Sequence, residues 1–407
     1  MKKLYVFLAS ISPGLFLIGY NIGTGSITTM ASAGASYGLG LLLPVLLSCI
    51  FTYFLIVVFG RYTIITGDTV LQSYRKHFGT LVASIVLGSL LISEWVSCMG
   101  VMGIVVQAVQ EWSRPLTSSG NGFSPLLLAL IFGSIIYGLF WQGTHRFFEK
   151  ILALFVGLMG ICFILTAFIV VPTPTDIIQG IKPYLPSDNR GLVLYAGMVG
   201  TTMGAILFVV RSILVQEKGW TLQDLAVEKR DAFISAGMMF ILSVAVMAAA
   251  AGTMYKEGLM VDNAIDMVRV LEPLAGRFAV SVFVAGIVCA GLSSLFPIVL
   301  LAPWLIADFR REPRNMKSAR SRLWVLWGVL LGLVIPIFGG RPVWIMIVSQ
   351  AAISVTTPLV LGLMLILYNR KDVLGRYTFN IKTNLLMSII VLFTVFTAFI
   401  GIKGLTT

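Results

Sequence analysis

The chain has 407 residues, of which 58% are hydrophobic and only 11% are charged. A soluble domain carries about 25% charged residues, so this composition excludes a soluble enzyme, a disordered protein and a secreted disulfide-bonded scaffold. The hydrophobic residues suffice for about eleven membrane spans of about 20 residues each. The sequence therefore predicts a polytopic α-helical membrane protein.

Apolar runs alternate along the whole chain with charged or Pro/Gly-rich connections. Each run is long enough to cross a bilayer as a helix. We expect eleven spans, at residues 4–36, 39–60, 79–109, 124–142, 150–172, 191–216, 232–253, 277–307, 323–340, 343–368 and 383–403.

The net charge of +12 is explained by membrane topology and does not call for a nucleic-acid partner. With the N-terminus in the cytoplasm, twenty basic residues fall in cytoplasmic connections, eight fall outside, and Arg211 remains within a span. Basic residues concentrate on the cytoplasmic side of membrane proteins. We therefore expect a multi-pass protein of the plasma (inner) membrane, with a cytoplasmic N-terminus and an external C-terminus.

The inventory of reactive side chains argues against an enzyme. The four cysteines lie singly in apolar runs, and both histidines, His77 and His145, fall in polar connections between spans. An intramembrane serine protease needs a base at depth, and a phosphate-cradling Gly-x-x-x-x-Gly-Lys loop is not found in the sequence. We predict no enzymatic activity and no cofactor.

Small residues interrupt the first and sixth spans, at residues 19–26 and 200–205. These two spans run in opposite directions, and paired interruptions of this kind indicate a transporter site between inverted halves. Close helix packing is the alternative explanation for such glycines. The expected substrate-binding residues are Asn21, Gly23, Thr24, Gly25 and Ser26 in the first span and Thr201, Thr202, Met203, Gly204 and Ala205 in the sixth.

Three stretches resemble the natural resistance-associated macrophage protein (Nramp) family of divalent-metal transporters. Residues 13–35 align without a gap with the family's Pro-Gly … Asp-Pro-Gly-Asn … Ala-Gly-Ala pattern. The end of the sixth span keeps Ser212, Leu214, Val215 and Gln216 of the family's segment, and the tenth span keeps Ser349, Gln350, Ser354 and Pro358. Gly291 to Ser294 in the eighth span also fit the family.

The resemblance implies a LeuT-like all-α integral membrane fold with eleven transmembrane helices and broken helices 1 and 6. The two inverted repeats of five helices would be residues 1–171 and 191–368, and residues 383–403 would form the eleventh helix. Transport would then proceed by alternating access, as spans 1, 2, 6 and 7 rock against the remaining helices.

The family's metal ligands are not kept in this sequence. The position of the metal-binding Asp is Gly23, that of the Asn is Ser26, and that of the Met is Gly204. The two family histidines align with Ile206 and Arg211, and the acidic pair of the third span aligns with Val101 and Ile104. Among the side-chain ligands only Gln350 remains, so the metal that could bind is left open and Gly204 is expected to enlarge the site.

Two charged residues are expected at membrane depth, namely Arg211 and Glu94, which is the one acidic residue of seventeen well inside an apolar run. They could form an ion pair that fixes two helices. Alternatively, Arg211 could anchor a substrate and Glu94 could carry a proton. Gln350 could bind substrate or make a helix–helix hydrogen bond. The break segments offer hydroxyls, one amide and backbone carbonyls, and Arg211 adds a positive charge nearby, so the expected site is neutral to positive.

Two functions follow as alternatives for a secondary-active transporter. Family inheritance predicts divalent-metal transport, of the Mn²⁺, Fe²⁺ and Mg²⁺ class, with a proton or another ion as the coupling partner. The local chemistry favours a small organic or anionic solute, because helix N-termini present free N–H groups and a positive dipole end. The sequence leaves the substrate and the coupling ion open.

Overall fold

The computed structural model describes residues 23–142, 174–263 and 279–406, with a few isolated positions between these ranges. Every regular element in these ranges is helical, and eight of the helices are long and apolar enough to cross a membrane. The spans are α4 (Leu42–Thr66), α5 (Val70–Ser113), α9 (Asn189–Thr202) continued by α10 (Ala205–Lys218), α11 (Leu225–Thr253), α13 (Ala279–Arg310), α14 (Ala319–Gly332) continued by α15 (Val334–Phe338), α16 (Pro342–Tyr368) and α18 (Ile381–Thr406).

Shorter helices complete the described part of the chain. α3 (Thr24–Tyr37) is the second half of the first predicted span, and α6 (Pro125–Gln142) is a shorter apolar helix at the fourth. Residues 4–22 of the first span lie outside the described residues, as does nearly all of the fifth, 150–172. The remaining short elements are α8 (Pro174–Gly180), α17 (Lys371–Leu374) and the 3₁₀ turns Arg114–Leu116, Leu222–Asp224, Tyr255–Glu257 and Gly375–Tyr377.

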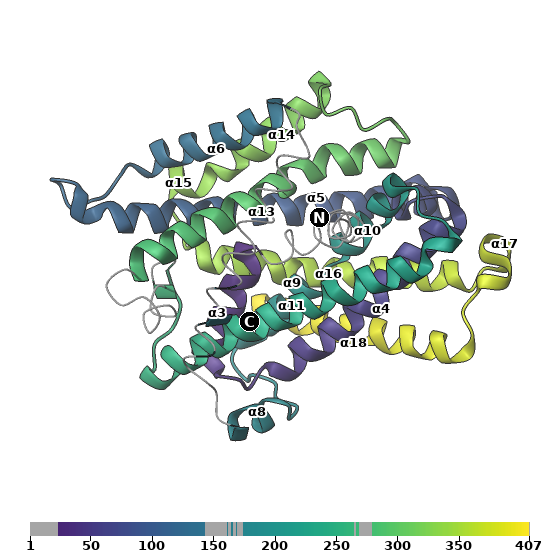
Figure 1. Ribbon diagram of the computed structural model, residues 1–407, viewed down its shortest axis with the longest axis horizontal. Coiled ribbons are helices and arrows are strands. Elements are labelled where there is room, and N and C mark those ends of the chain that lie inside the picture. Colours follow the sequence, from purple (N-terminus) through teal and green to yellow (C-terminus); the bar gives the residue numbers. More distant parts are fainter. Residues whose placement is uncertain are drawn as a thin grey trace, which may run out of the picture.

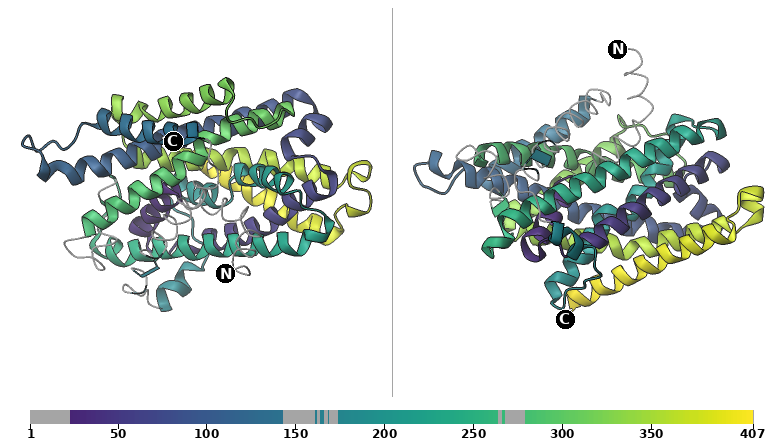
Figure 2. Two further views of the ribbon diagram at one scale, coloured as in Figure 1. Left: turned by 45° about the horizontal axis from the view of Figure 1, so that its top comes forward. Right: turned by 60° about the horizontal axis from the view of Figure 1, so that its bottom comes forward.

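The helices form two groups on either side of α16 (Figure 1). In the first group α11 packs against α3 and α4, and α10 packs against α4. In the second, α5 packs against α13 and α14, and α14 also contacts α6. α16 contacts α9 on one side and α5 on the other, while α18 lies along α16 and α9. Figure 2 shows the same grouping from two further directions.

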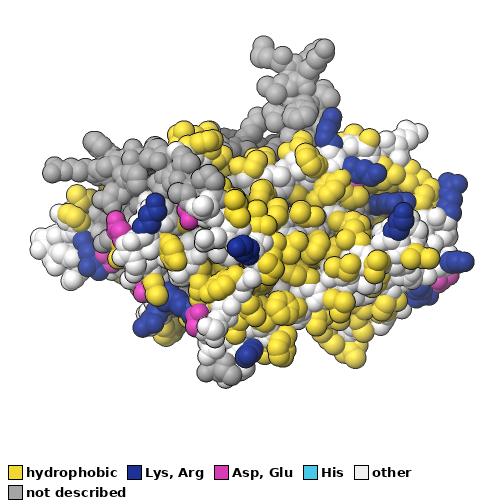
Figure 3. All heavy atoms as spheres, turned by 90° about the horizontal axis from the view of Figure 1, so that it is seen from below, with side chains coloured by type: hydrophobic (Ala, Val, Ile, Leu, Met, Phe, Trp, Pro, Cys, Tyr) yellow, Lys and Arg dark blue, Asp and Glu magenta, His cyan; other side chains and the backbone are white. Residues whose placement is uncertain are grey.

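The surface has the distribution of polarity that a bilayer requires. Large hydrophobic side chains of α6, α14 and α18 are exposed. In Figure 3 hydrophobic side chains cover the middle of one face, and Lys and Arg side chains gather at its right-hand end. Since water does not favour exposed apolar areas of this extent, this face is suited to lipid.

Several helices begin or end beyond the spans predicted from hydropathy, and three of the extensions bear on the site. α5 begins nine residues early, at Val70, behind a capping box formed by Thr69 and Gln72, and it bends sharply at Gly79, where φ is 87° and ψ is 165°. α11 begins at Leu225 and α13 continues to Arg310. These extensions carry charged residues, which a hydropathy pattern assigns to connections.

Asp188 holds the N-terminus of α9 next to the end of α3. Its carboxylate accepts a hydrogen bond from the Gly191 N–H at 2.8 Å and another from the Tyr37 hydroxyl at 2.7 Å. Burial alone would raise the pKa of Asp188, but these hydrogen bonds outweigh it and hold the pKa below its ordinary value. The capping carboxylate therefore stays ionised at neutral pH, as a helix N-terminus favours.

Gly34 sets the closeness of α3 and α11. A Cβ atom at this position would lie 2.2 Å from the carbonyl oxygen of Met247, so Gly34→Ala should force the helices apart and cost about 1–3 kcal/mol. Gly237→Ala on α11 is the matched control, because no neighbouring atom lies within 4 Å of its added methyl group. Thermal unfolding of the two variants in detergent checks this, and equal melting temperatures would contradict it.

Candidate functional site

The helix of the sixth span is broken in its middle, as the small residues in the sequence predicted. α9 ends at Thr202 and α10 begins at Ala205, while Met203 and Gly204 leave the helical conformation. In the first span, α3 begins directly after Gly23, whose backbone is extended. A break exposes backbone groups that lipid cannot satisfy, so it must face protein or a polar cavity.

The first backbone N–H group of each half-helix already donates a hydrogen bond to a side-chain hydroxyl. The Thr24 N–H at the start of α3 donates to Ser294 Oγ at 3.2 Å, and the Ala205 N–H at the start of α10 donates to Thr357 Oγ1 at 3.1 Å. These donors were expected to hold an oxyanion. Because α13 and α16 supply acceptors for them, the case for an anion at the breaks is weakened.

A small cavity, lined mostly by buried residues, lies between the two breaks. Its volume is about 30 Å³, which is enough for about two water molecules on the same measure. Its polar side chains are Ser26, Glu94, Ser97, Thr201, Ser294 and Gln350. Apolar side chains and glycines complete the wall, namely Gly23, Gly25, Val101, Gly200, Gly204, Ile206, Leu207, Ile298, Met346 and Ile353.

Glycines let α16 enter this space. A Cβ atom on Gly25 would lie 2.5 Å from Met346 Cε and 2.8 Å from Gln350 Nε2, so both side chains lie directly against α3. A Cβ atom on Gly100 would be 3.0 Å from Met346 Sδ. Gln350 and the thioether of Met346 are therefore fixed at the cavity wall.

Gly204 does not enlarge the cavity, contrary to expectation. A Cβ atom there would lie 2.6 Å from Ile353 Cγ2, so a branched side chain of α16 occupies the space. The glycine permits close packing of the break against α16 instead.

Glu94 lies in the cavity wall, and its side chain is only 2% exposed. The cavity thus contains a carboxyl group, which the expectation of a neutral to positive site did not include. Glu94 lies on α5, one turn before Ser97, which also lines the cavity. Sequence reasoning placed Glu94 at membrane depth but could not tell which face of α5 meets the breaks.

Arg211 is paired elsewhere and does not line the cavity. The guanidinium contacts the carboxylates of Asp231, in a short contact, and Glu228, at 3.2 Å, and it lies 5.2 Å from the centre of the Trp220 ring. All three ion-pairing side chains are buried. The hypotheses that Arg211 pairs with Glu94 or anchors a substrate are therefore not supported by its position, which is in an ion-pair cluster between α10 and α11.

Buried acidic residues of this cluster and of α13 were not recognised from the sequence, because they flank the predicted spans. Asp231 immediately precedes the span predicted at 232–253, and Asp308 immediately follows the one at 277–307. Both are buried, as is Glu228, so Glu94 is not the only buried acidic residue, although the other three flank the apolar runs. Their partners lie far away in sequence or in the next helix, where a hydropathy pattern gives no signal.

The predicted site residues fall into three groups in the structure. Six line the cavity, namely Gly23, Gly25, Ser26, Thr201, Gly204 and Gln350. A second group is buried next to the breaks without lining the cavity, namely Thr24, Thr202, Met203 and Ala205. Asn21 lies outside the described residues. Ser97, Ser294 and Met346 line the cavity without having been predicted.

A family model described as "Natural resistance-associated macrophage protein-like" matches residues 14–403. The chain belongs to the Nramp family. It is 24% identical over 97% of its length to a natural resistance-associated macrophage protein 2 homolog of Dictyostelium discoideum, and it spans 63% of that protein's length. It is 22% identical to the divalent metal cation transporter MntH of Caldanaerobacter subterraneus subsp. tengcongensis, over 91% of this chain and 88% of MntH.

Solved structures show the same fold. The Eremococcus coleocola manganese transporter superposes with a TM-score of 0.75 at 13% identity, covering 98% of this chain and 86% of the transporter chain. MhsT in complex with L-phenylalanine gives a TM-score of 0.64 at 14% identity, covering 95% of this chain and 98% of MhsT. This Nramp chain therefore has the LeuT-like transporter fold that its sequence predicted.

The Nramp chain offers a mixed set of donors at its breaks. Within the described ranges, no group of three or more His, Cys, Asp or Glu side chains could hold a metal ion. A cation in the cavity would meet one carboxyl group from Glu94, hydroxyl and amide oxygens from Ser26 and Gln350, and the thioether of Met346. Such a set combines hard oxygen donors with one soft sulfur donor.

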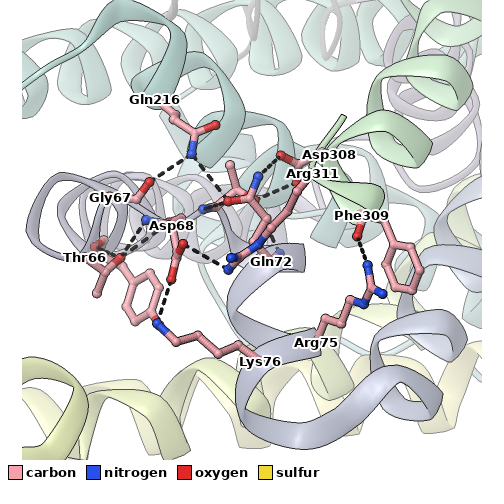
Figure 4. A network of polar contacts seen from close by, with 12 residues as sticks. Thr66, Gly67, Asp68, Gln72, Arg75, Lys76, Gln216, Asp308, Phe309 and Arg311 are labelled. Carbon is pink, nitrogen blue, oxygen red and sulfur yellow. Dashed lines mark hydrogen bonds and ion pairs between the residues drawn. The ribbon is translucent and has the colours of Figure 1, made fainter. Parts of the chain in front are cut away.

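A second polar cluster, the corner network, joins the α4–α5 corner to the ends of α10 and α13 (Figure 4). At its centre, Asp308 accepts hydrogen bonds from Thr69 Oγ1 at 2.6 Å and Gln72 Nε2 at 3.0 Å, and it pairs with Arg314 at 3.3 Å. Arg311 pairs with Asp68 at 3.2 Å. The network thus ties α13 to the corner.

The end of α10 is also held by the corner network. Gln216 donates to the Gly67 carbonyl at 2.9 Å, and Arg314 donates to Gln216 Oε1 at 3.3 Å and forms a short ion pair with Glu217. Deeper in the same contact, the Val70 N–H donates to Ser212 Oγ at 3.1 Å. The network therefore fastens the first helix group, through α10, to the second, through α5 and α13.

Proposed function

We propose that this Nramp chain is a secondary-active transporter of divalent metal ions, of the Mn²⁺, Fe²⁺ and Mg²⁺ class. The observation that carries the proposal is the position of Glu94, whose carboxyl group faces a cavity between the two helix breaks. A buried carboxylate attracts a cation strongly in a medium of low dielectric constant. The names of the family's relatives, which include a divalent metal cation transporter and a manganese transporter, agree with this substrate class.

The donor set favours a partly hydrated ion over a bare one. A single carboxylate cannot replace the water shell of a dication, and Mg²⁺ and Mn²⁺ keep several waters where protein ligands are few. The carbonyl end of α9, at Gly200 and Thr201, adds a negative dipole end to the cavity. Met346 adds a thioether, which favours a transition metal over Mg²⁺.

The alternative, transport of a small organic or anionic solute, has less support. Its proposed anchor, Arg211, is buried in ion pairs away from the cavity. The leading N–H groups of α3 and α10 are engaged by hydroxyls, and the cavity accommodates only about two waters. No observation specifically favours this solute class.

Uptake into proteoliposomes separates the two functions. The full chain should take up Mn²⁺, and with it Fe²⁺ or Mg²⁺, against empty-vesicle controls, and the same ions should raise its melting temperature in detergent. An amino acid or a small carboxylate, tested in parallel, should do neither. If none of the three ions moves and none stabilises the protein, divalent-metal transport is wrong.

We propose that the N-terminus is cytoplasmic, that the C-terminus is external and that the plasma (inner) membrane holds the protein. Basic side chains are frequent in the connections at the end where α10 and α13 finish, and a Lys and Arg group is visible at the right-hand end of Figure 3. The inverted repeats, residues 1–171 and 191–368, are part of the same proposal. Labelling of single cysteines placed at residues 220 and 406 from either side of intact cells tests the orientation.

We propose alternating access by rocking of the first helix group against the second, with the corner network closing the cytoplasmic end. Arg314→Ala should loosen this closure, because its contacts with Asp308, Gln216 and Glu217 bridge the two groups. Each lost hydrogen bond is worth about 0.5–1.5 kcal/mol, so alkylation of a cysteine at buried Ser212 should be about two- to tenfold faster. Arg320→Ala, which removes a surface pair with Glu312, should leave the rate unchanged.

A further inference from the structure

Where α11 begins against α10, three ionisable side chains are enclosed together, and we call them the triad: Arg211, Glu228 and Asp231. Each is at most 1% exposed. With both carboxylates ionised, the triad carries two negative charges and one positive charge. A buried charge without a counter-charge is strongly unfavourable, and a carboxylate in that position is neutralised by binding a proton.

The two carboxylates do not share the guanidinium equally. Asp231 makes the short contact with Nη1 of Arg211, whereas Glu228 Oε1 lies 3.2 Å from Nη2. The other oxygen, Glu228 Oε2, is buried and has no hydrogen-bond donor among the described residues. Glu228 is thus the less compensated carboxylate.

Among the described residues, Arg211 is the one cationic side chain that forms an ion pair with Glu228. On α4, Gly60 lies so close that a Cβ atom there would be 2.5 Å from Glu228 Oε1. On α16, the Tyr368 hydroxyl lies near Glu228 but does not donate to it, because it donates to the Val58 carbonyl at 2.7 Å. On α11 itself, Lys229 is exposed and attracts Glu228 from a distance, while Asp231 repels it.

We propose that the triad is a proton-binding site, with the proton carried by Glu228 at Oε2. Taking up the proton changes the net charge of the triad from minus one to zero and leaves Arg211 paired with Asp231. No bond other than the O–H bond forms, and the proton comes from water.

This site goes beyond the proposed cation site and is separate from it. The triad does not line the cavity that contains Glu94, so proton and cation need not compete for one carboxylate. Arg211 lies on α10, the half-helix that follows the break in the sixth span, and Glu228 and Asp231 lie on α11. The charge change therefore falls within the helix group that we propose to move. A coupling proton is the chemical class of ligand that the triad fits.

Infrared difference spectroscopy of the full chain in detergent, without added cation, tests the proposal independently of transport. At neutral pH the chain carrying Glu94→Gln, in which the other buried glutamate cannot contribute, should show the carbonyl stretch of a protonated carboxyl group that disappears at high pH. Adding Glu228→Gln should remove this band. Asp231→Asn should also remove it, because Glu228 would then have the guanidinium to itself and stay ionised.

In the Glu94→Gln chain, a band that persists when Glu228→Gln or Asp231→Asn is added would overturn the proposal. Thermal unfolding gives a second measurement. A folded chain that keeps a proton which the unfolded chain releases loses stability as the pH rises. The wild-type melting temperature should therefore fall as the pH rises above the ordinary Glu pKa of about 4.3, whereas that of Glu228→Gln should stay flat. If the melting temperatures of the wild type and Glu228→Gln changed with pH in parallel, the proposal would also be contradicted. Neither measurement depends on transport, so both test the triad even if metal-ion transport is disproved.

Discussion

Glu94→Gln should abolish divalent-cation binding and uptake while leaving the protein folded. Gln keeps the shape of the side chain in the cavity wall but removes its charge. Loss of one partner from a buried charge pair costs about 2–5 kcal/mol, which corresponds to about 30- to 5,000-fold weaker binding. The loss should appear both in Mn²⁺ uptake by proteoliposomes and in the Mn²⁺-dependent rise of the melting temperature.

The control for this experiment is Glu111→Gln on the same helix. Glu111 pairs with Arg114 near the surface at 2.6 Å, and it does not line the cavity, so its replacement should leave Mn²⁺ binding unchanged. Wild-type affinity in Glu94→Gln, with an intact fold, would show that the cavity carboxyl does not bind the cation and would remove the main support for metal transport.

Arg211→Ala should destabilise the protein more than any other single change considered. It leaves Asp231, and with it Glu228, buried without the guanidinium that now contacts both. Breaking a buried ion pair by removing one partner costs about 3–5 kcal/mol. The free energy of unfolding, or the melting temperature in detergent where unfolding is irreversible, measures the effect.

Two companion variants separate this effect from a role in substrate binding. Neutralising the whole triad with Arg211→Met, Glu228→Gln and Asp231→Asn together should recover most of the stability, because no buried charge is then left unpaired. Arg370→Ala, which removes an exposed pair with Asp372, should have little effect. If Arg211→Ala had wild-type stability and abolished uptake of an organic anion, the structural role assigned to Arg211 would be wrong.

Part of the site could be predicted from local sequence alone. Small residues at 200–205 identified the break, and Gly23, Gly25 and Ser26 identified the start of α3, because glycine tolerates conformations and approaches that other residues do not. Gln350 was found through the family resemblance. Each of these signals is contained in a few neighbouring residues.

The charges of the site could not be predicted in the same way. Whether Glu94 faces the breaks depends on the rotation of α5 about its axis, and the neighbours of Arg211 depend on how α10 packs against α11. Hydropathy alone assigned Asp231 and Asp308 to connections, although both are buried and paired. The expected neutral to positive cavity therefore lacked the carboxyl group that the structure places in its wall.

Hydropathy and local motifs alone predicted a multi-span helical membrane protein with a broken sixth span and the Nramp pattern, because hydropathy and local backbone preference are properties of short segments. The tertiary structure decided which charges meet which. It placed Glu94 at the cavity, enclosed Arg211 between Glu228 and Asp231, and filled the space beside Gly204 with Ile353. These outcomes depend on the packing of helices far apart in the chain, and electrostatic energy at membrane depth depends on just such distances.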